Sequence, residues 1–369
     1  MSEEQSRTSV LSAIWRSKSF AVLGRFLALG LVFLLFCALV EGGKFYSIRN
    51  LENILRQSAV YATAALGMTM VIVSAGIDLS IGSTIALSVV VVAAVLNINW
   101  TEVDQGQTQT IYLLHQYPTL LPIAAVLAGV AAATLAGLLN GVTIVYLRLV
   151  PFIVTLGTMG VFRGLAKGIA HEKDIYPPED TWISSIMDPT VSTWHRWFTG
   201  ESQTPPSGLG WLILPPGVWL MIIAALFAAL LLRYTRFGRH VFAIGSNEET
   251  ARLCGVPVGR TKILVYTLAG FFAGLAALMQ FSFIGGIGQP NTAIAYELFV
   301  IAAVVIGGGS LMGGEGSVLG SVLGALIITI LNMGGQQAGW PRWVQEMVIG
   351  AIIIAAVTVD QIRLRRSAA

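Results

Sequence analysis

Side chains that could do chemistry are few and scattered in this sequence of 369 residues. There is no GxxxxGK[ST] loop for nucleotide phosphates, no HExxH zinc motif and no GxSxG nucleophile. The four histidines fall singly in predicted loops, and the two cysteines, Cys37 and Cys254, are too far apart for a CxxC site. The sequence therefore predicts no catalytic residue, no metal site and no cofactor on this chain, which argues against an enzyme.

The composition indicates a membrane environment for the elements that hold these residues. Hydrophobic residues make up 55% of the chain and charged residues only 11%, against roughly 25% charged in soluble domains. Glycine, with 40 copies, is frequent in transmembrane helices. These values exclude a soluble enzyme, and the net charge of +3 gives no reason to expect nucleic acid as a partner. We expect an all-α polytopic protein with membrane lipid around it.

Ten apolar stretches approach the length of about 20 residues that a spanning helix needs. They are 22–40, 58–75, 82–97, 120–147, 150–170, 212–232, 263–284, 297–312, 316–333 and 344–360. The N-terminal tail 1–21, the loop 233–262 and the C-terminal tail 361–369 are basic, whereas 98–119 and 171–210 are acidic. Because basic loops stay inside, the transmembrane domain 22–360 should have cytoplasmic termini, a cytoplasmic loop at 233–262 and an external loop at 171–210. That external loop is either a cap on its own protein or a binding surface.

The cytoplasmic stretch 243–262 carries the signals of a short helix. Ser246 with Glu249 three residues later predicts a capping box, and Gly255 predicts a left-handed C-terminal stop. A helix of about eight residues is marginal in water. It should therefore pack against its own membrane domain as a connector, or dock to a soluble partner.

One ionisable residue, Asp78, is predicted at membrane depth. It could cap the start of the third span or line a solute path. Gly76 and Gly82 beside it predict a helix break that faces protein or a water-filled cavity. Arg163, on the fifth span, is expected to reach the interface or to contact an external protein.

A second glycine-dense stretch, 307–316, lies in a segment that aligns without gaps to residues 71–83. The alignment suggests an internal duplication, parallel by the span count and inverted if one break is miscounted. Helix breaks or close helix packing are predicted at Gly308, Gly313, Gly316 and Gly320. Close packing is also predicted at the pairs Gly137/Gly141 and Gly270/Gly274, and at Gly324.

Three stretches resemble known transport proteins. Glu249-Thr250-Ala251, followed by Gly255, resembles the EAA…G loop of membrane subunits in bacterial ABC importers, with Thr250 where the family has Ala. GMTMVIVSAGIDLSIGS (67–83) and VIGGGSLMGGEGSVLG (305–320) resemble signature segments of the permeases for ribose, galactose, xylose and arabinose, which are related to branched-chain amino acid permeases. The resemblance covers residues 50–360.

The resemblance implies a permease subunit in the bacterial inner membrane, paired with an identical or homologous second permease subunit. Two cytoplasmic ABC ATPase subunits, or one fused tandem ATPase, would hold ATP and Mg and sit under the helix 247–254. The coupling residues implied are Ser246, Glu249, Ala251 and Gly255. A periplasmic sugar-binding protein would deliver a monosaccharide. A branched-chain amino acid permease is the first alternative; a secondary carrier is less favoured, because it needs carboxylates within the spans and Asp78 is nearly alone there.

A sugar path needs hydrogen-bonding side chains and aromatic faces. Candidates for lining it are Asp78, Asn140, Gln280, Phe281, Asn291 and Asn332, with Phe283 and Tyr296. Each of them could instead serve packing alone.

Overall fold

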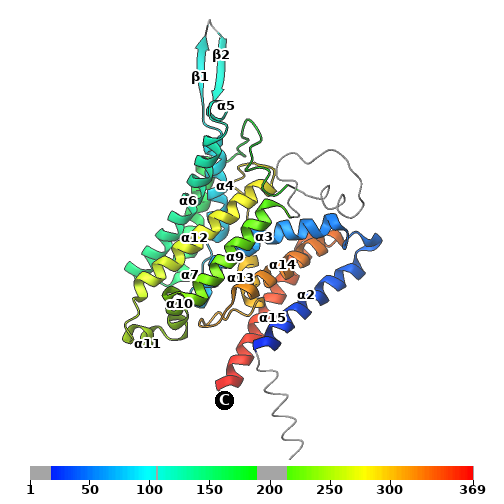
Figure 1. The fold of residues 1–369 in the computed structure, drawn as a ribbon, viewed down its shortest axis with the longest axis vertical. Coiled ribbons are helices and arrows are strands. Elements are labelled where there is room, and N and C mark those ends of the chain that lie inside the picture. Colours follow the sequence, from blue (N-terminus) through cyan, green and yellow to red (C-terminus); the bar gives the residue numbers. More distant parts are fainter. Residues whose placement is uncertain (1–17, 105–106, 189–213, 369) are drawn as a thin grey trace, which may run out of the picture.

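The computed structural model describes residues 18–104, 107–188 and 214–368, which are mostly helical (Figure 1). The helices at the ten predicted spans are α2 (Lys18–Leu39), α3 (Ile48–Val73), α4 (Ile81–Leu96), α6 (Leu120–Tyr146), α7 (Pro151–Ile169), α9 (Pro216–Tyr234), α12 (Val258–Phe283), α13 (Tyr296–Ile306), α14 (Val318–Gln337) and α15 (Arg342–Ala368). The short elements are η1 (Glu41–Gly43), β1 (Asn99–Asp104), β2 (Gln107–Tyr112), α5 (Leu113–Gln116), α10 (Arg236–Ser246) and α11 (Glu248–Leu253). Residues 1–17 of the predicted N-terminal tail and 189–210 of the predicted external loop lie outside the described residues.

Each of the ten predicted spans overlaps one helix, and α13 is the shortest of these helices. Within the described residues, α6, α7, α9, α12 and α14 are long and apolar enough to cross a membrane. The chain is therefore a polytopic, predominantly helical membrane protein. Helix α13 has 11 residues, which at 1.5 Å per residue cover only about half of a hydrocarbon core of about 30 Å. Ten crossings and two cytoplasmic termini stay predictions.

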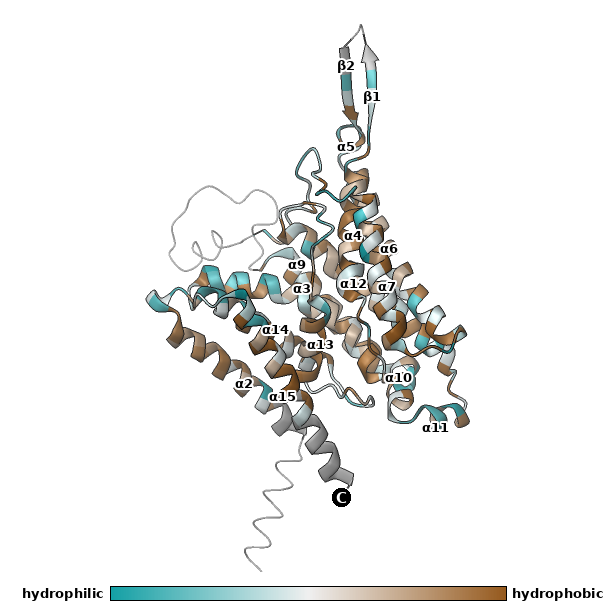
Figure 2. Cartoon of the chain, turned by 180° about the vertical axis from the view of Figure 1, so that it is seen from behind, coloured by the Kyte–Doolittle hydropathy of each residue, from teal (hydrophilic) through white to brown (hydrophobic). Residues whose placement is uncertain are grey.

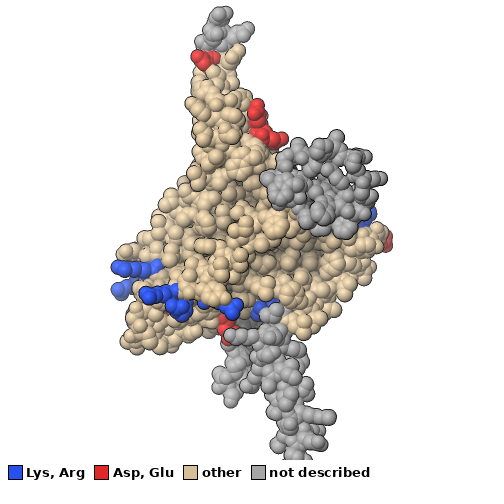
Figure 3. Space-filling view, in the orientation of Figure 1, with Lys and Arg blue, Asp and Glu red and all other residues tan. Residues whose placement is uncertain are grey.

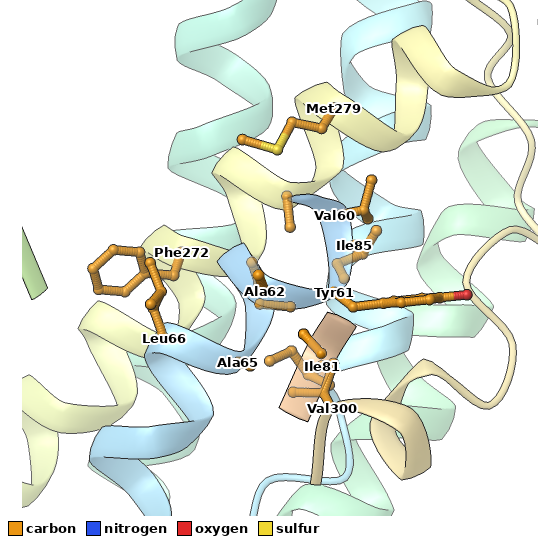
Figure 4. Close-up of a cluster of buried hydrophobic side chains, with 14 of the residues drawn as sticks. Val60, Tyr61, Ala62, Ala65, Leu66, Ile81, Ile85, Phe272, Met279 and Val300 are labelled. Carbon is orange, nitrogen blue, oxygen red and sulfur yellow. The ribbon is translucent and has the colours of Figure 1, made fainter. Parts of the chain in front are cut away.

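Helix α3 forms the centre of the core. It contacts α9, α12, α13 and α14, and every residue from Ser58 to Val73 is buried. Figure 4 shows its side chains, including Leu66, among residues of α4, α12 and α13. A helix that is surrounded on all sides needs no polar face, which explains the apolar run. The helix also begins ten residues before the predicted span, because its polar first turns were excluded by hydropathy.

Close packing at glycine is confirmed where α6 crosses α12. A Cβ on Gly137 would overlap the carbonyl oxygen of Tyr266 and lie 2.9 Å from the Cα of Gly270. Gly324 in α14 likewise lies against the backbone of Ala303 in α13. Small residues thus let these helix backbones approach, as they do in many membrane proteins.

A β-hairpin is the element that the all-α prediction missed. Strands β1 and β2 pair antiparallel from Asn99↔Tyr112 to Asp104↔Gln107 and project beyond the helices (Figure 1). The strands are rich in Thr, Gln and Asn rather than alternating apolar residues, so they lack the period-two pattern by which half-buried strands are recognised.

The described part of the predicted external loop packs on its own chain. Ile175 forms a β-bridge with Gly288, and Ser282 at the end of α12 hydrogen-bonds the backbone of Ser184 and Met187. This part of the loop therefore acts as a cap over the end of α12.

Hydrophilic and charged residues are unevenly distributed over the molecule. The long helices are predominantly hydrophobic, whereas hydrophilic residues gather at α11 and near the turn between α2 and α3 (Figure 2). On the face drawn in Figure 3, most Lys and Arg side chains lie at the end with α10 and α11, whereas acidic side chains lie toward the hairpin end and also at the lower and side edges. The predicted C-terminal tail continues helix α15 rather than leaving it.

Candidate functional site

The predicted cytoplasmic helix 247–254 corresponds to α11 (Glu248–Leu253), and a helix that was not predicted, α10 (Arg236–Ser246), directly precedes it. Thr235 caps α10 by accepting from Gly238 N at 3.1 Å. Asn247 caps α11 by accepting from Thr250 N at 2.8 Å. The predicted capping box of Ser246 and Glu249 is therefore wrong, because Ser246 is the last residue of α10. Gly255 does adopt the predicted left-handed conformation, with φ of 80°.

Helix α11 is anchored on one face and exposed on the other. Ala251 is buried in a small apolar cluster with Ile244 and Val258. Glu248 joins α11 to α12 through Lys262 Nζ at 2.6 Å. On the opposite face Glu249 is exposed and Leu253 is 88% exposed. A six-residue helix held in this way presents an apolar side chain and a carboxylate outward.

The first helix break lies between α3 and α4, at Ser74–Ser80, and includes Gly76. Asp78 is buried, and its Oδ1 accepts from Ser80 N at 2.8 Å and from Ser80 Oγ at 2.6 Å. Asn140 of α6 donates to the same hydroxyl at 2.8 Å. Asp78 does not cap α4, because that helix begins at Ile81 and has no side-chain cap bond. The carboxylate instead fixes the turn before the helix and, through Ser80, contacts α6.

The second break lies between α13 and α14 and meets the first in space. Gly314 N donates to Val73 O at 2.9 Å. Gly313, with φ of 89°, lies against Ala75, and Gly316 packs on Val73. The two stretches that align in the sequence therefore both form helix–break–helix units in contact, while the duplication and its direction stay predictions.

Helix α10 closes on both breaks. Gly245 lies against Val73 O, and a Cβ on it would be 2.5 Å from Gly314 N. The exposed helix α11 is the next helix along the chain, so it is connected through α10 to the end of α3 and to the second break.

Of the six glycines predicted around the two breaks (Gly76, Gly82, Gly308, Gly313, Gly316 and Gly320), two lie inside helices. Gly82 belongs to the first turn of α4, where a Cβ would be 2.5 Å from Ala293 O, and it does not interrupt that helix. Gly320 lies in α14 against the backbone of Gly307. Gly308 has φ of 84° and borders the Arg25 guanidinium, so the break itself begins there.

Some of the predicted path residues form a polar and aromatic cluster. Gln280 Nε2 donates to Thr292 Oγ1 at 2.9 Å, and Tyr296 Oη donates to Gln280 Oε1 at 3.1 Å. The ring of Tyr61 packs edge-on against Tyr296 with centroids 4.8 Å apart. Tyr61 also interacts with Asn332. Two phenols, two amides and a hydroxyl thus converge from α3, α12, the loop before α13, α13 and α14.

The other predicted path residues lie elsewhere. Phe281 is 1% exposed within the core. Asn291 is exposed on a loop, with no hydrogen bond to another described residue, and Asn140 belongs to the network around Ser80. Sequence reasoning missed Tyr61 and Gln57, whose side chains are joined by a 3.3 Å hydrogen bond. Their spacing of four residues at the polar end of an apolar run was the available signal.

Arg163 neither extends to the interface nor stands free for an external protein. Its Nη1 donates to Pro290 O at 2.9 Å and to Thr292 O at 2.6 Å. Helix α7 thereby holds the loop that carries Thr292, next to the cluster of Gln280 and Tyr296.

Comparison with known proteins places the chain among transport permeases. Residues 50–357 match the family described as "Branched-chain amino acid transport system / permease component". The ribose import permease protein RbsC of Escherichia coli (strain K12) is 36% identical over 317 residues, 86% of this chain and 87% of that protein. The galactose/methyl galactoside import permease protein MglC of the same strain is 35% identical over 337 residues, 91% and 93% of the two chains.

The likeness extends to a second bacterium. The ribose import permease protein RbsC of Bacillus subtilis (strain 168) is 34% identical over 340 residues, 92% of each chain. No solved structure matches this chain. Given the match over most of its length, the chain belongs to the family of permease components of branched-chain amino acid transport systems, and it is similar along that length to permeases named for ribose and galactose import.

Proposed function

We propose that this chain is the membrane-spanning permease subunit of an ATP-driven ABC importer that carries a monosaccharide into the cytoplasm. The observation that carries the proposal is the likeness to ribose and galactose import permeases over 86–92% of the chain. The bacterial relatives and the apolar helices support a location in the bacterial inner membrane. A second permease subunit, identical or homologous, would complete the pore.

The energy would come from a cytoplasmic ATPase, as two subunits or one fused tandem chain, that binds ATP and Mg. The proposed contact is α11, whose outward face carries Glu249 and the exposed Leu253. A short helix anchored by Ala251 can transmit force, because the ion pair of Glu248 with Lys262 ties it to α12. Movement of α11 would reach the interior through α10, which touches both helix breaks at Gly245.

A periplasmic sugar-binding protein would release the sugar to the cavity of the pore. The cluster of Tyr61, Gln280, Thr292 and Tyr296 suits such a solute, since hydroxyl and amide groups exchange hydrogen bonds with sugar hydroxyls and an aromatic face packs on C–H groups. Charged groups are not needed for this task. We place Asn332 at the edge of the same path because it interacts with Tyr61.

The test is uptake into proteoliposomes that contain the permease with its ATPase and a saturating binding protein. Radiolabelled ribose and galactose should enter with ATP, and Glu249→Lys and Leu253→Ser should each lower the rate at least tenfold. Arg239→Ser, on an exposed position of α10, is the matched control and should transport normally. Unchanged uptake by both α11 variants would rule out the coupling role.

A second candidate function follows from the family description, which names branched-chain amino acids. Uptake of labelled leucine in place of both sugars would favour it. Sugar uptake by the permease without any ATPase would instead establish a secondary carrier.

A further inference from the structure

A cavity of about 560 Å³ lies beside α11, where the turn between α6 and α7 meets α11 and the start of α12. Its polar lining consists of three cations and one carboxylate: Arg148, Arg252, Lys262 and Glu248. The remainder of the lining is apolar or glycine, and includes Ile144, Val145 and Leu149. This volume is within the range of small-ligand sites, and the cavity lies apart from both the outward face of α11 and the cluster around Gln280.

The charges of the cavity are unbalanced. Glu248 is shared between Lys262 Nζ at 2.6 Å and Arg252 Nη2 at 3.2 Å. Arg148 has neither a hydrogen bond nor an ion pair with any residue in the described part of the chain. Three positive groups against one negative group leave a positive field, and Arg and Lys are the side chains that bind phosphate oxygens. The cavity is therefore suited to an anion.

The backbone of Arg148 strengthens this reading. Its φ is 53°, in the left-handed region, just after the end of α6. Gly or Asn is the usual residue at such a position because other side chains are strained there. An arginine here carries a conformational cost, while its guanidinium borders the cavity.

The surroundings of the cavity favour a lipid over a free anion. Beside Arg148, Tyr146, Leu147 and Val150 are 74%, 64% and 59% exposed. Exposed apolar and tyrosine side chains next to cations are typical of the membrane–water interface. A phospholipid whose headgroup occupied the cavity could extend its acyl chains over these side chains, whereas a soluble anion would make no contact with them.

We propose that this cavity binds the phosphate headgroup of an anionic phospholipid, with its acyl chains along α6 and α7. Basic pockets between transmembrane helices on the cytoplasmic side are known to take such headgroups. The phosphate would contact Arg148 of the α6–α7 turn together with Arg252 of α11 and Lys262 of α12. The lipid would then bridge three elements and hold α11 in its docked position.

Native mass spectrometry of the full chain in detergent tests the proposal. Phosphatidylglycerol and phosphatidylcholine with identical acyl chains are titrated separately against the wild type, Arg148→Asn and Arg236→Asn. Asn tolerates the left-handed backbone, so Arg148→Asn should remain folded, which its melting temperature checks. We expect Arg148→Asn to bind phosphatidylglycerol about fivefold more weakly, as the loss of one basic contact implies. Arg236→Asn should bind phosphatidylglycerol as tightly as the wild type, because Arg236 is an exposed cation of α10 outside the cavity.

Three results would overturn the proposal. The first is equal affinity of Arg148→Asn and the wild type for phosphatidylglycerol. The second is displacement of the lipid by millimolar inorganic phosphate, which would identify a free anion as the ligand. The third is unchanged lipid binding combined with weaker retention of the ATPase, which would assign the cavity to the protein interface.

Discussion

The crossing of α6 and α12 gives the sharpest test of the packing. We expect Gly137→Ala to destabilise the protein, because the new Cβ would lie 2.9 Å from the Cα of Gly270 and overlap Tyr266 O. Carbon atoms prefer separations of about 3.5–4.0 Å, so the two helices must move apart along their contact. Overpacking of this kind costs about 1–3 kcal/mol, while replacing a helical glycine by alanine returns up to about 1 kcal/mol.

The matched control is Gly157→Ala in α7, where a Cβ would meet no atom within 4 Å. It should keep the free energy of unfolding or raise it by up to about 1 kcal/mol. The two variants should therefore differ by about 2 kcal/mol. The assay is reversible unfolding in mixed detergent micelles, followed by circular dichroism. Agreement of the two variants within about 0.5 kcal/mol would show that the backbones do not approach this closely.

Three more predictions concern polar contacts. Asp78→Ala should lower the free energy of unfolding by about 1–3 kcal/mol because it removes two hydrogen bonds of Ser80. Asp78→Asn keeps a hydrogen-bond acceptor and should lower it less, and equal losses in the two variants would contradict this role of Oδ1. The hydrogen bond of 2.7 Å between the hydroxyls of Thr69 and Ser321 should give a coupling energy of about 0.6 kcal/mol in a double-mutant cycle with alanine. A coupling energy of zero would contradict this contact. Arg163→Gln should speed hydrogen exchange at residues 288–295, since two carbonyl contacts are lost, while Lys167→Gln should not.

The sequence predicted the helices well because hydropathy reports burial in lipid and in the core alike. It could not separate the two environments. Helix α3 reads as an ordinary span, yet it is surrounded by protein from Ser58 to Val73. Its first turns, with Asn50 and Glu52 buried, were excluded because polar residues count against a span. The hairpin was missed for the same reason, since its strands carry no apolar pattern.

The candidate site shows where local signals become ambiguous. Both Ser246 and Asn247 are good helix-capping residues, and the side chain of each could accept a hydrogen bond from the backbone N–H three residues later. The choice depends on α10, whose buried Val241, Ile244 and Gly245 keep the backbone helical through Ser246, so the cap falls to Asn247. The pairing of the two helix breaks was beyond local reasoning altogether, because Val73 and Gly314 are far apart in the chain and meet only in the folded protein.

That meeting point is the physical reason to connect the exposed helix pair with the interior. Gly245 leaves no space between α10 and the two breaks, and closely packed interiors transmit a displacement instead of absorbing it. A shift of α10 would have to carry the breaks along or strain the bond from Gly314 N to Val73 O, at a cost of about 1 kcal/mol. The breaks can follow, since Gly308, Gly313 and Gly314 already occupy the left-handed region, where glycine moves at little cost. The tight backbone contact at Gly245, next to flexible glycine backbone, is the arrangement that would let a force applied at α11 move the helix breaks.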